Sequence, residues 1–509
     1  MARRWWTLVV VCLAIFMLLL DITIVNVALP DIARELDASF SDLQWVVNAY
    51  ALTLAALLLT AGSLADRLGR RAVFAVGLVL FTASSLACAL APSALFLILA
   101  RGAQGVGGAV MFSVSLALLA QEFHGRDRAT AFAIWGATTG AAVAVGPLVG
   151  GALTSGMGWP AIFYLNLPIG AVALWLTLTR VRETRDPGAR GVDWIGTVLF
   201  SGALFALVLG LIRGNAEGWG SAPIVALLAG AAALLVAFVA VERRREEPML
   251  DLALFRKPAF CGASIAAFTL SAAMFSMFLY LTIYLQTILG YGPFEAGLRL
   301  LPISLLSFVV AAASGRMTAR VPPRVLLGAG LLLTGAGLLL MTGLDATSHW
   351  TALLPGFVVA GAGIGLTNPP LASTAIGVVP PRRSGMASGI NTTFRQVGLA
   401  TGIAGWGAIF ESQITDRLAH TLPAALGARA AEVATAVSGG GAPGLLDRAP
   451  AAARAPLRDA IDAAFTGSLD HILVLAGLVA LGGAVCAAAL VRGRDFVAPP
   501  ATASEPAAA

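Results

Sequence analysis

Long apolar segments separated by short polar connections constrain the fold of this chain more than any other feature. About fourteen of them reach roughly 20 residues, the length that an α-helix needs to cross the hydrocarbon core of a bilayer. Only 12% of the 509 residues are charged, against about 25% in soluble proteins. Backbone groups in lipid must bond to one another, and a helix achieves this within one segment. We therefore predict an all-α integral membrane protein with about 14 transmembrane helices.

Arginine and lysine side chains predict the orientation of these helices. A cytoplasmic N-terminus places most of them on the cytoplasmic side, as the positive-inside rule requires. An even number of spans returns Arg492 and Arg494 to the same side, so both termini are expected to be cytoplasmic. The net charge of +6 is spread over short loops and forms no basic patch with interleaved aromatic residues. No nucleic-acid partner is therefore expected.

Polar segments divide the chain into parts. Residues 1–190 are expected to form a six-helix bundle, and residues 246–495 a second, pseudo-symmetric one. Two additional linker helices fall in 191–245. Within the second bundle, the Ala/Gly/Pro-rich stretch at about 418–466 is expected to be an external loop. The Ala/Pro-rich tail 496–509 is expected to be disordered.

The sequence offers little for catalysis. The four cysteines lie inside apolar segments without the spacing of metal ligands, so we interpret them as small core residues. The four histidines are scattered along the chain, and there is no phosphate-binding glycine loop of the Walker type. We therefore expect no metal, no cofactor and no enzymatic activity.

The connection Gly62–Arg71, with the sequence GSLADRLGRR, is the most informative short motif. One helix must end and the next begin within it, and its arginines keep it on the cytoplasmic side. Asp66 can cap a helix start or pair with a cation on a neighbouring helix. A second, degenerate copy lies at Gly315–Arg324; it keeps the glycine and arginines but lacks the acid. This repetition indicates two related bundles with a path between them.

The loop Gly62–Arg71 resembles the signature loop between helices 2 and 3 of the major facilitator superfamily. Leu20–Pro30 is similar to the first helix of its 14-span drug:proton antiporters. Arg101–Gly108 is similar to the fourth-helix motif linked to proton handling, and Gly146–Gly151 to the fifth-helix motif associated with exporters. Ala142 stands where the family usually has glycine. The resemblance covers nearly the whole chain and implies two helical bundles around a central cavity.

The resemblance also implies which residues hold and move the bundles. A cytoplasmic latch that stabilises the outward-facing state would consist of Gly62, Asp66, Arg67, Gly69, Arg70 and Arg71. The antiporter motif of the fifth helix would consist of Gly140, Gly146, Pro147, Gly150 and Gly151. Small residues allow helices to approach closely, and proline removes a backbone hydrogen bond and can bend a helix.

Asp21, an acid inside an apolar segment, is the first candidate for proton coupling. A buried acid in lipid must be paired, hydrated or protonated. Counting back from Pro30 places it roughly 13 Å below the outer surface, and Arg101 lies roughly 10 Å deep in the fourth span. We expect Asp21 to titrate and Arg101 to tune its proton; a fixed structural ion pair is the alternative. Glu411 is a second candidate, with a solvated helix terminus as its alternative.

Polar and aromatic side chains inside the apolar segments are candidates for the wall of a substrate cavity. Polar groups there are expected to face water in a cavity rather than lipid, and aromatic rings suit greasy ligands. Each aromatic residue alone is more often a packing residue. The predicted cavity residues are Asn26, Gln44, Asn48, Gln104, Phe112, Trp135, Tyr280, Tyr284, Asn391, Arg395 and Trp406.

Together with the resemblance, these residues predict a multi-pass exporter in a bacterial plasma membrane. It would exchange protons for a small amphipathic molecule by alternating access, as a monomer, with the lipid bilayer as its other partner. Cationic and neutral cargo both fit. One alternative is export of a lipid or an endogenous natural product on the same fold. Another is a membrane sensor or scaffold that transports nothing; a proton-symporting importer is disfavoured by Gly146–Gly151.

Overall fold

The computed structural model describes residues 3–38, 40–123, 125–185, 193–245, 250–318, 320–345, 348–380, 384–421, 430–438 and 441–496. Within these ranges the chain is helical and contains no β-strand. The first seven helices are α1 (Arg3–Glu35), α2 (Phe40–Leu68), α3 (Arg70–Ala89), α4 (Ala94–Glu122), α5 (Gly125–Met157), α6 (Pro160–Tyr164) and α7 (Asn166–Arg180). Next come α8 (Trp194–Glu217), α9 (Ala222–Glu242), α10 (Pro258–Leu270), α11 (Met277–Ile283), α12 (Pro293–Met317), α13 (Pro323–Leu340) and α14 (Leu354–Gly377). The last are α15 (Ser384–Thr421), α17 (Ala430–Ser438), α18 (Ala442–Arg448) and α19 (Ala451–Leu490).

The lengths of these helices agree with a chain that crosses a membrane many times. Among the described residues, 11 helices are long and apolar enough to span, or 12 if the bent α2 is one span. The helices α5 and α15, with 33 and 38 residues, stand outside that count. In α15 the apolar sequence is interrupted by Asn391, Arg395 and Glu411. The protein is therefore an all-helical, multi-pass membrane protein.

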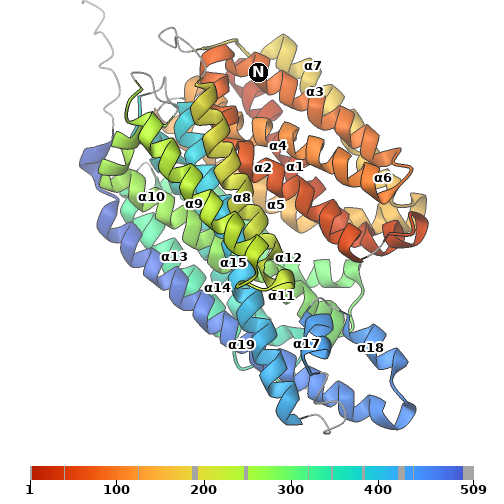
Figure 1. Cartoon of the computed structure of the whole chain (residues 1–509). Coiled ribbons are helices and arrows are strands. Elements are labelled where there is room, and N and C mark those ends of the chain that lie inside the picture. The colour runs from red at the N-terminus through yellow and green to blue at the C-terminus, as the bar shows by residue number, and fades with distance from the viewer. Residues whose placement is uncertain are drawn as a thin grey trace, which may run out of the picture.

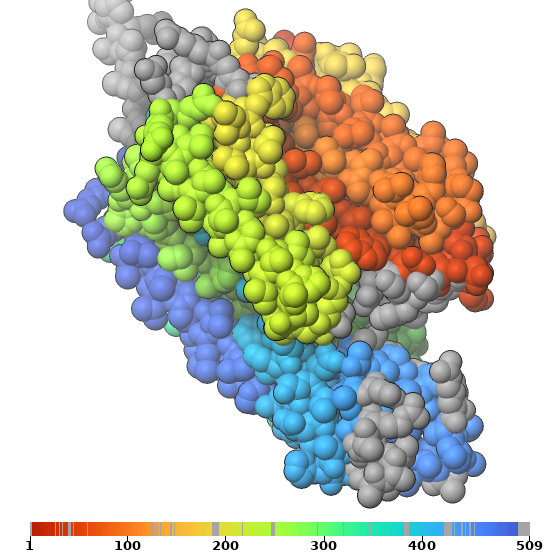
Figure 2. All heavy atoms as spheres, viewed as in Figure 1, coloured from red at the N-terminus to blue at the C-terminus, as the bar shows by residue number. Residues whose placement is uncertain are grey.

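The helices gather in two halves. In Figure 1 the red to orange helices α1 to α7 lie on one side, and the green to blue helices α10 to α19 lie on the other. The halves meet where α5 packs against α12 and α14, and where α2 and α4 pack against α15. The helix α8 packs against both α2 and α15, and α9 packs against α8. Figure 2 shows α8 and α9 covering the junction between the halves on this face.

The segment that we expected to be an external loop, 418–466, is largely helical in its described residues. The helix α15 continues to Thr421, the short helices α17 and α18 follow, and α19 begins at Ala451. Short helices agree with an Ala-rich connection, since alanine has the highest helix propensity of all residues; the position of this segment on the external side stays a prediction. Only residue 496 of the predicted tail 496–509 falls within the described residues.

Two π-helical segments, Ser271–Phe275 and Tyr284–Ile288, interrupt the helical path on either side of α11. In the first, the backbone N–H of Ser276 donates to the carbonyl five residues back, at 3.1 Å. The carbonyl of Ala272 thereby loses its usual helical donor, and it accepts from the indole Nε1 of Trp406 on α15 at 2.6 Å. Such π segments occur frequently at functional sites, and this one fixes α10 to α15.

The glycines of α5 form two faces. On one face, a Cβ atom at Gly146 would overlap the side chain of Thr23 on α1, and a Cβ at Gly150 would lie 2.8 Å from Cγ1 of Ile24. On the other face, a Cβ at Gly140 would lie 3.6 Å from Oγ of Ser307 on α12. The helix α5 is thus in close contact with α1 in its own half and in ordinary contact with the opposite half.

We expect Gly146→Ala to lower stability by about 1–3 kcal/mol, because the added methyl group must push α1 and α5 apart. The measurement is the thermal unfolding midpoint of the purified protein in detergent. The matched control is Gly482→Ala on α19, where a Cβ would meet nothing within 4 Å. Equal midpoints for the two variants would show that the close contact between α1 and α5 is not as tight as the structure has it.

Candidate functional site

Asp21 on α1 and Arg101 on α4 form an ion pair in the interior of the first half. The Arg101 Nη1 and Asp21 Oδ2 atoms are 2.5 Å apart, and each residue is 1% exposed. The two residues therefore lie close together in the structure, as predicted. A buried ion pair recovers the cost of desolvation only if further hydrogen bonds satisfy the remaining atoms.

Two side-chain amides supply those bonds. Nε2 of Gln104 and Nδ2 of Asn166 each donate to Asp21 Oδ1 at 2.9 Å. Nδ2 of Asn166 also donates to the hydroxyl of Ser85 at 2.9 Å, and that hydroxyl donates to the Phe163 carbonyl at 3.0 Å. The carboxylate of Asp21 is therefore the meeting point of side chains from α1, α4 and α7, with α3 attached through Ser85.

The guanidinium of Arg101 is held on several sides. Its Nη1 also donates to Oε1 of Gln104 at 2.7 Å, and its Nε donates to the carbonyl of Val46 on α2 at 3.1 Å. The ring of Tyr50 lies 4.3 Å from the guanidinium carbon, a cation–π distance. Because the carboxylate accepts every bond made to it here, a proton on Asp21 would remove its charge and turn one acceptor into a donor. Protonation is thus tied to the packing of four helices.

Residues of the predicted latch bond to one another at the junction of α2 and α3. Nε and Nη2 of Arg70 donate to Oδ1 of Asp66 at 2.9 and 2.8 Å. Oδ2 of Asp66 accepts from the backbone N–H of Met386, in the first turn of α15, at 3.0 Å. Free N–H groups at a helix start bind anions well. Asp66 therefore connects the first half of the molecule to the start of a helix in the second half.

Glu183, which follows α7, bonds to the same junction and was missed by sequence reasoning. Its carboxylate accepts from the backbone N–H groups of Arg71 and Ala72, at 3.0 and 2.9 Å, and so caps α3. Gly69 has a φ of 116° and packs against this carboxylate; a Cβ there would lie 2.7 Å from Oε1 of Glu183. Gly62 is buried in α2, and Arg67 is half-buried in its last turn.

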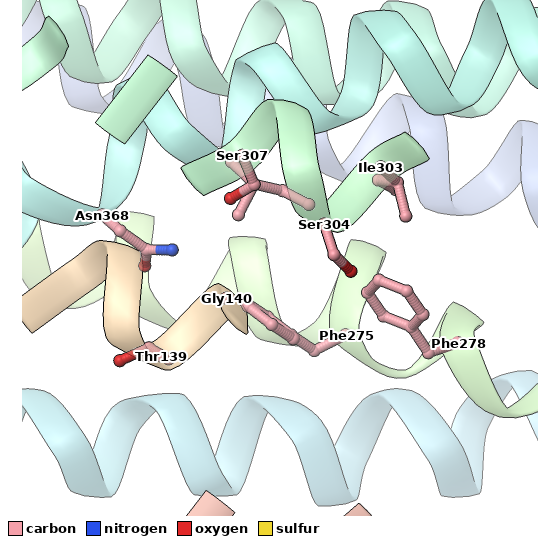
Figure 3. Close-up of a pocket in the computed structure, with 9 residues that line it drawn as sticks. Thr139, Gly140, Phe275, Phe278, Ile303, Ser304, Ser307 and Asn368 are labelled. Carbon is pink, nitrogen blue, oxygen red and sulfur yellow. The ribbon is translucent and has the colours of Figure 1, made fainter. Parts of the chain in front are cut away.

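A pocket lies where the two halves meet, beside α5 (Figure 3). Its wall combines hydroxyl and amide groups with two aromatic rings, and Figure 3 shows these side chains converging from several helices. The lining residues are Thr139, Gly140, Phe275, Phe278, Ile303, Ser304, Ser307, Ile364 and Asn368. The pocket is small, with a volume of about 20 Å³, far below the roughly 300–1,000 Å³ of a typical small-molecule site.

Arg395, a predicted cavity residue, forms a hydrogen bond to one of the residues that line this pocket. Its Nη1 donates to Oδ1 of Asn368 at 3.2 Å. Gly140, predicted as part of the antiporter motif, lines the pocket itself. Gln104 belongs to the Asp21 network instead.

Most of the other predicted cavity residues whose side chains the structure describes lie in packed surroundings. Phe112 and Trp135 meet edge to face in the first half, with ring centroids 5.9 Å apart. The Tyr280 hydroxyl donates to a backbone carbonyl of α15 at 2.8 Å, and Tyr284 stacks on Phe465. Trp406 bonds to the π segment. Asn391 is buried in α15 and Asn48 is half-buried in α2; the side chains of Asn26, Gln44 and Pro147 lie outside the described residues.

Glu411 lies far along α15 from Arg395, near the segment that contains α17. Its Oε1 accepts from the hydroxyl of Thr435 on α17 at 2.5 Å. The structure therefore does not bring Glu411 together with Asp21 and Arg101. Its role in proton coupling stays a prediction.

Sequence reasoning missed Asn166, Glu183 and most of the pocket wall. Asn166 is an amide at the start of an apolar helix, which was a usable signal. Ser304 and Ser307 are one helical turn apart and follow Pro302, while Asn368 directly precedes two prolines inside α14. Such pairings of polar residues with helix-distorting prolines indicate irregular, functional places in membrane helices.

The sequence of this chain is similar to one family of known proteins. The sequence matches the profile of the Major Facilitator Superfamily over residues 11–403. The multidrug resistance protein Stp of Mycobacterium tuberculosis is 39% identical over 413 residues, which cover 81% of this chain and 77% of that protein. The tetracenomycin C resistance and export protein of Streptomyces glaucescens is 34% identical over 495 residues, which cover 95% and 91%.

A solved structure shows the same fold. The human organic anion transporter MFSD10 superimposes with a TM-score of 0.61 at 16% identity, and the match covers 94% of this chain and 100% of that one. With a family profile that matches most of the sequence and relatives that align over most of their length, this chain belongs to the major facilitator superfamily.

Proposed function

We propose that this protein is a proton-coupled exporter of small amphipathic molecules, a drug:proton antiporter that works by alternating access in a bacterial plasma membrane. The observation that carries the proposal is the buried Asp21–Arg101 pair, because an acid buried inside a membrane bundle marks a proton or ion pathway by default. The relatives named for multidrug resistance and for tetracenomycin C export support drug efflux. Proton exchange then supplies the driving force.

Coupling would arise from the two forms of Asp21. The ionised carboxylate pairs with Arg101 and holds α1, α4 and α7 in the arrangement described above. A proton arriving from outside would release Arg101 and two amide donors and so favour a different arrangement of these helices. Substrate would favour the opposite one. Each ligand shifts the equilibrium by its difference in affinity between the two states.

The cytoplasmic ends of the two halves would form the inner gate. Asp66 bonds to the start of α15, and the hydroxyl of Ser388 on α15 donates to the carbonyl of Ser113 on α4 at 2.9 Å. Both contacts must break before the cavity can open to the cytoplasm. The arrangement is that of a transporter closed on its inner side, and this supports the latch role proposed for Gly62–Arg71.

The proposal also includes a topology. Adding α5 and α15 to the 12 apolar spans that include α2 gives 14, an even number that puts both termini in the cytoplasm. Two six-helix bundles, 1–190 and 246–495, would flank the substrate path, with 191–245 supplying two further helices. A single chain carries all these parts, so we propose that the monomer is the functional unit.

The test is substrate-driven proton movement in inside-out membrane vesicles. With an acidic interior recorded by a fluorescent pH probe, we expect an exported compound to dissipate the gradient only in vesicles that contain the protein. The panel should include lipophilic dyes, antibiotics, phospholipid analogues and aromatic natural products. A response to lipid analogues alone would replace the drug exporter by a lipid exporter. If no compound moved protons in sealed vesicles, the sensor or scaffold would be the better function.

A further inference from the structure

The side chains that bond to Asp21 are all hydrogen-bond donors. Its Oδ2 accepts from Nη1 of Arg101, and its Oδ1 accepts from Nε2 of Gln104 and from Nδ2 of Asn166. A carboxylate offers only acceptor atoms, so this arrangement fits the ionised form. A protonated carboxyl group has an O–H that needs an acceptor, and none of these three nitrogen atoms is one. Proton uptake therefore requires one of the three side chains to change the atom that it presents to Asp21.

Arg101 and Gln104 cannot make that change while they remain bonded to each other. A guanidinium has five N–H donors and no acceptor atom. Oε1 of Gln104 accepts from Nη1 of Arg101 at 2.7 Å. Turning this amide over would therefore set its NH2 group against another donor. Of the three bonding partners, Asn166 is the one that remains.

Asn166 is held in its present orientation by Ser85 on α3. The Ser85 hydroxyl has one hydrogen, which it donates to the carbonyl of Phe163 on α6 at 3.0 Å. Its oxygen is therefore the acceptor for Nδ2 of Asn166, at 2.9 Å. Ser85, Asn166 and Phe163 are each at most 1% exposed, so bulk water does not offer other partners. Both the Asp21 carboxylate and the Ser85 oxygen thus require the NH2 group of this amide rather than its carbonyl.

A hydroxyl can rotate and an amide can turn over, so this part of the network has a second arrangement. In it, the carbonyl oxygen of Asn166 accepts from protonated Asp21 through one lone pair and from the rotated Ser85 hydroxyl through the other. The Ser85 hydroxyl then no longer bonds to the Phe163 carbonyl. One proton on Asp21 is thereby linked to the loss of a bond between α3 and α6.

We propose that Ser85 and Asn166 form a hydrogen-bond relay that responds to the proton on Asp21. Ionised Asp21 keeps the Ser85 hydroxyl on the Phe163 carbonyl, and protonated Asp21 releases it. The proton comes from external water and stays on a carboxylate oxygen of Asp21, so no other covalent bond forms or breaks. The inference rests on the proposed proton-coupled function and adds to it two positioning residues, which carry the state of Asp21 to α3 and α6.

The charged and titratable groups that face Asp21 come from three helices. They are Arg101 on α4, Tyr50 on α2 and Cys88 on α3. In α5, α6 and α7 such side chains occur in the first turn of α5, at the exposed Tyr164 and in the last turn of α7. The two relay residues do not titrate, so any effect that they have on pH dependence must act through Asp21.

The experiment follows the proton on Asp21 without transport. Infrared difference spectra of the full-length protein in lipid nanodiscs, recorded between high and low pH, show the C=O stretch of a protonated carboxyl group. Its absence in Asp21→Asn assigns the band. Ser85→Ala frees the Asn166 amide to turn over, so we expect half-protonation at a pH roughly one unit higher, a tenfold change in the equilibrium. The control Ser84→Ala removes a neighbouring buried hydroxyl outside the relay and should leave the titration unchanged.

A double variant separates the relay from a general loosening of the packing. Asn166→Leu removes one donor to the carboxylate and should also move half-protonation to higher pH. Because Ser85 acts on Asp21 only through Asn166, Ser85→Ala should add nothing in the Asn166→Leu background. Ser85→Thr keeps the hydroxyl and should titrate like the wild type.

A second signature needs no Ser85 variant. In wild-type protein with isotope-labelled asparagine, a side-chain amide band should shift in step with the Asp21 band, and that shift should be missing in Asn166→Leu. Equal titrations of the wild type and Ser85→Ala, additive shifts in the double variant, or an amide band that ignores the proton would overturn the relay and leave the exporter standing. If Asp21 took up no proton at any pH at which the protein stays folded, the relay would fall together with proton coupling at Asp21.

Discussion

Asp21→Asn is expected to reduce substrate-driven proton movement to the level of vesicles that lack the protein. An amide cannot take up and release a proton in the physiological range, so the arriving proton loses its acceptor. The amide can still accept from Gln104 and Asn166, which donate to Asp21 Oδ1 in the wild type, and we therefore expect the variant to fold. Dissipation of an imposed pH gradient in inside-out vesicles is the measurement.

A matched change of an exposed acid separates this effect from a general loss of negative charge. Asp37 lies in the connection after α1 and is exposed, and Asp37→Asn should leave exchange intact. Full coupled export by the Asp21→Asn protein would show that the buried pair is a structural element only. That outcome would also remove the main support for proton antiport at this site.

Arg101→Met is expected to cost about 3–5 kcal/mol of stability, because removing one member of a buried pair leaves an uncompensated carboxylate in an apolar interior. Methionine restores neither the charge nor the hydrogen bonds to Gln104 and Val46, so the Asp21 carboxylate keeps only its two amide donors. The measurement is the loss of tertiary structure on denaturant titration in detergent. The double variant Asp21→Asn/Arg101→Met removes the stranded charge and should recover much of the loss.

The surface pair Arg213–Glu217 on α8 provides the comparison. Exposed pairs of this kind contribute about 0–1 kcal/mol, so Arg213→Met should have a small effect. Similar losses for the two methionine variants, or no recovery in the double variant, would show that the Asp21 carboxylate is not stranded by the loss of Arg101.

The ion pair between Asp21 and Arg101 could be predicted because opposite charges inside apolar helices must compensate each other. The 1.5 Å rise per residue of an α-helix also placed the two residues at similar depths in the membrane. Asn166 could not be predicted in the same way. An amide has no charge to compensate, and its contact depends on how α7 is rotated against α1. Glu183 was beyond sequence reasoning for a related reason, since nothing local to the connection after α7 indicates that it caps a helix that starts more than a hundred residues earlier.

The positions of the helices could be predicted where segment length and hydrophobicity determine them. Local departures from regular helix geometry could not be predicted. Apolar segments of about 20 residues follow from the thickness of the bilayer, and helices occur at all the places expected from them. The carbonyl of Ala272 in the π segment Ser271–Phe275 accepts from the Ser276 hydroxyl and from Trp406, a partner over a hundred residues away. The continuation of α15 to Thr421 buries Phe410, Ile414 and Leu418, each 0% exposed, against partners that are distant in the sequence.

The helix α15 bonds both to Asp66 and to Asn368, which lines the pocket. Near its start, the N–H of Met386 holds Asp66, and nine residues later Arg395 reaches the pocket wall; at 1.5 Å per residue the two points are about 13 Å apart on one continuous rod. Beyond Arg395, α15 is pressed against α10 at Gly398 and against the π segment Ser271–Phe275 at Gly402, where a Cβ would lie 2.5 Å from a backbone carbonyl oxygen. The helix is thus held by Asp66 near its start and by this close packing further along. A tilt of α15 about this packing would break the bond to Asp66 and would at the same time move Arg395 relative to Asn368.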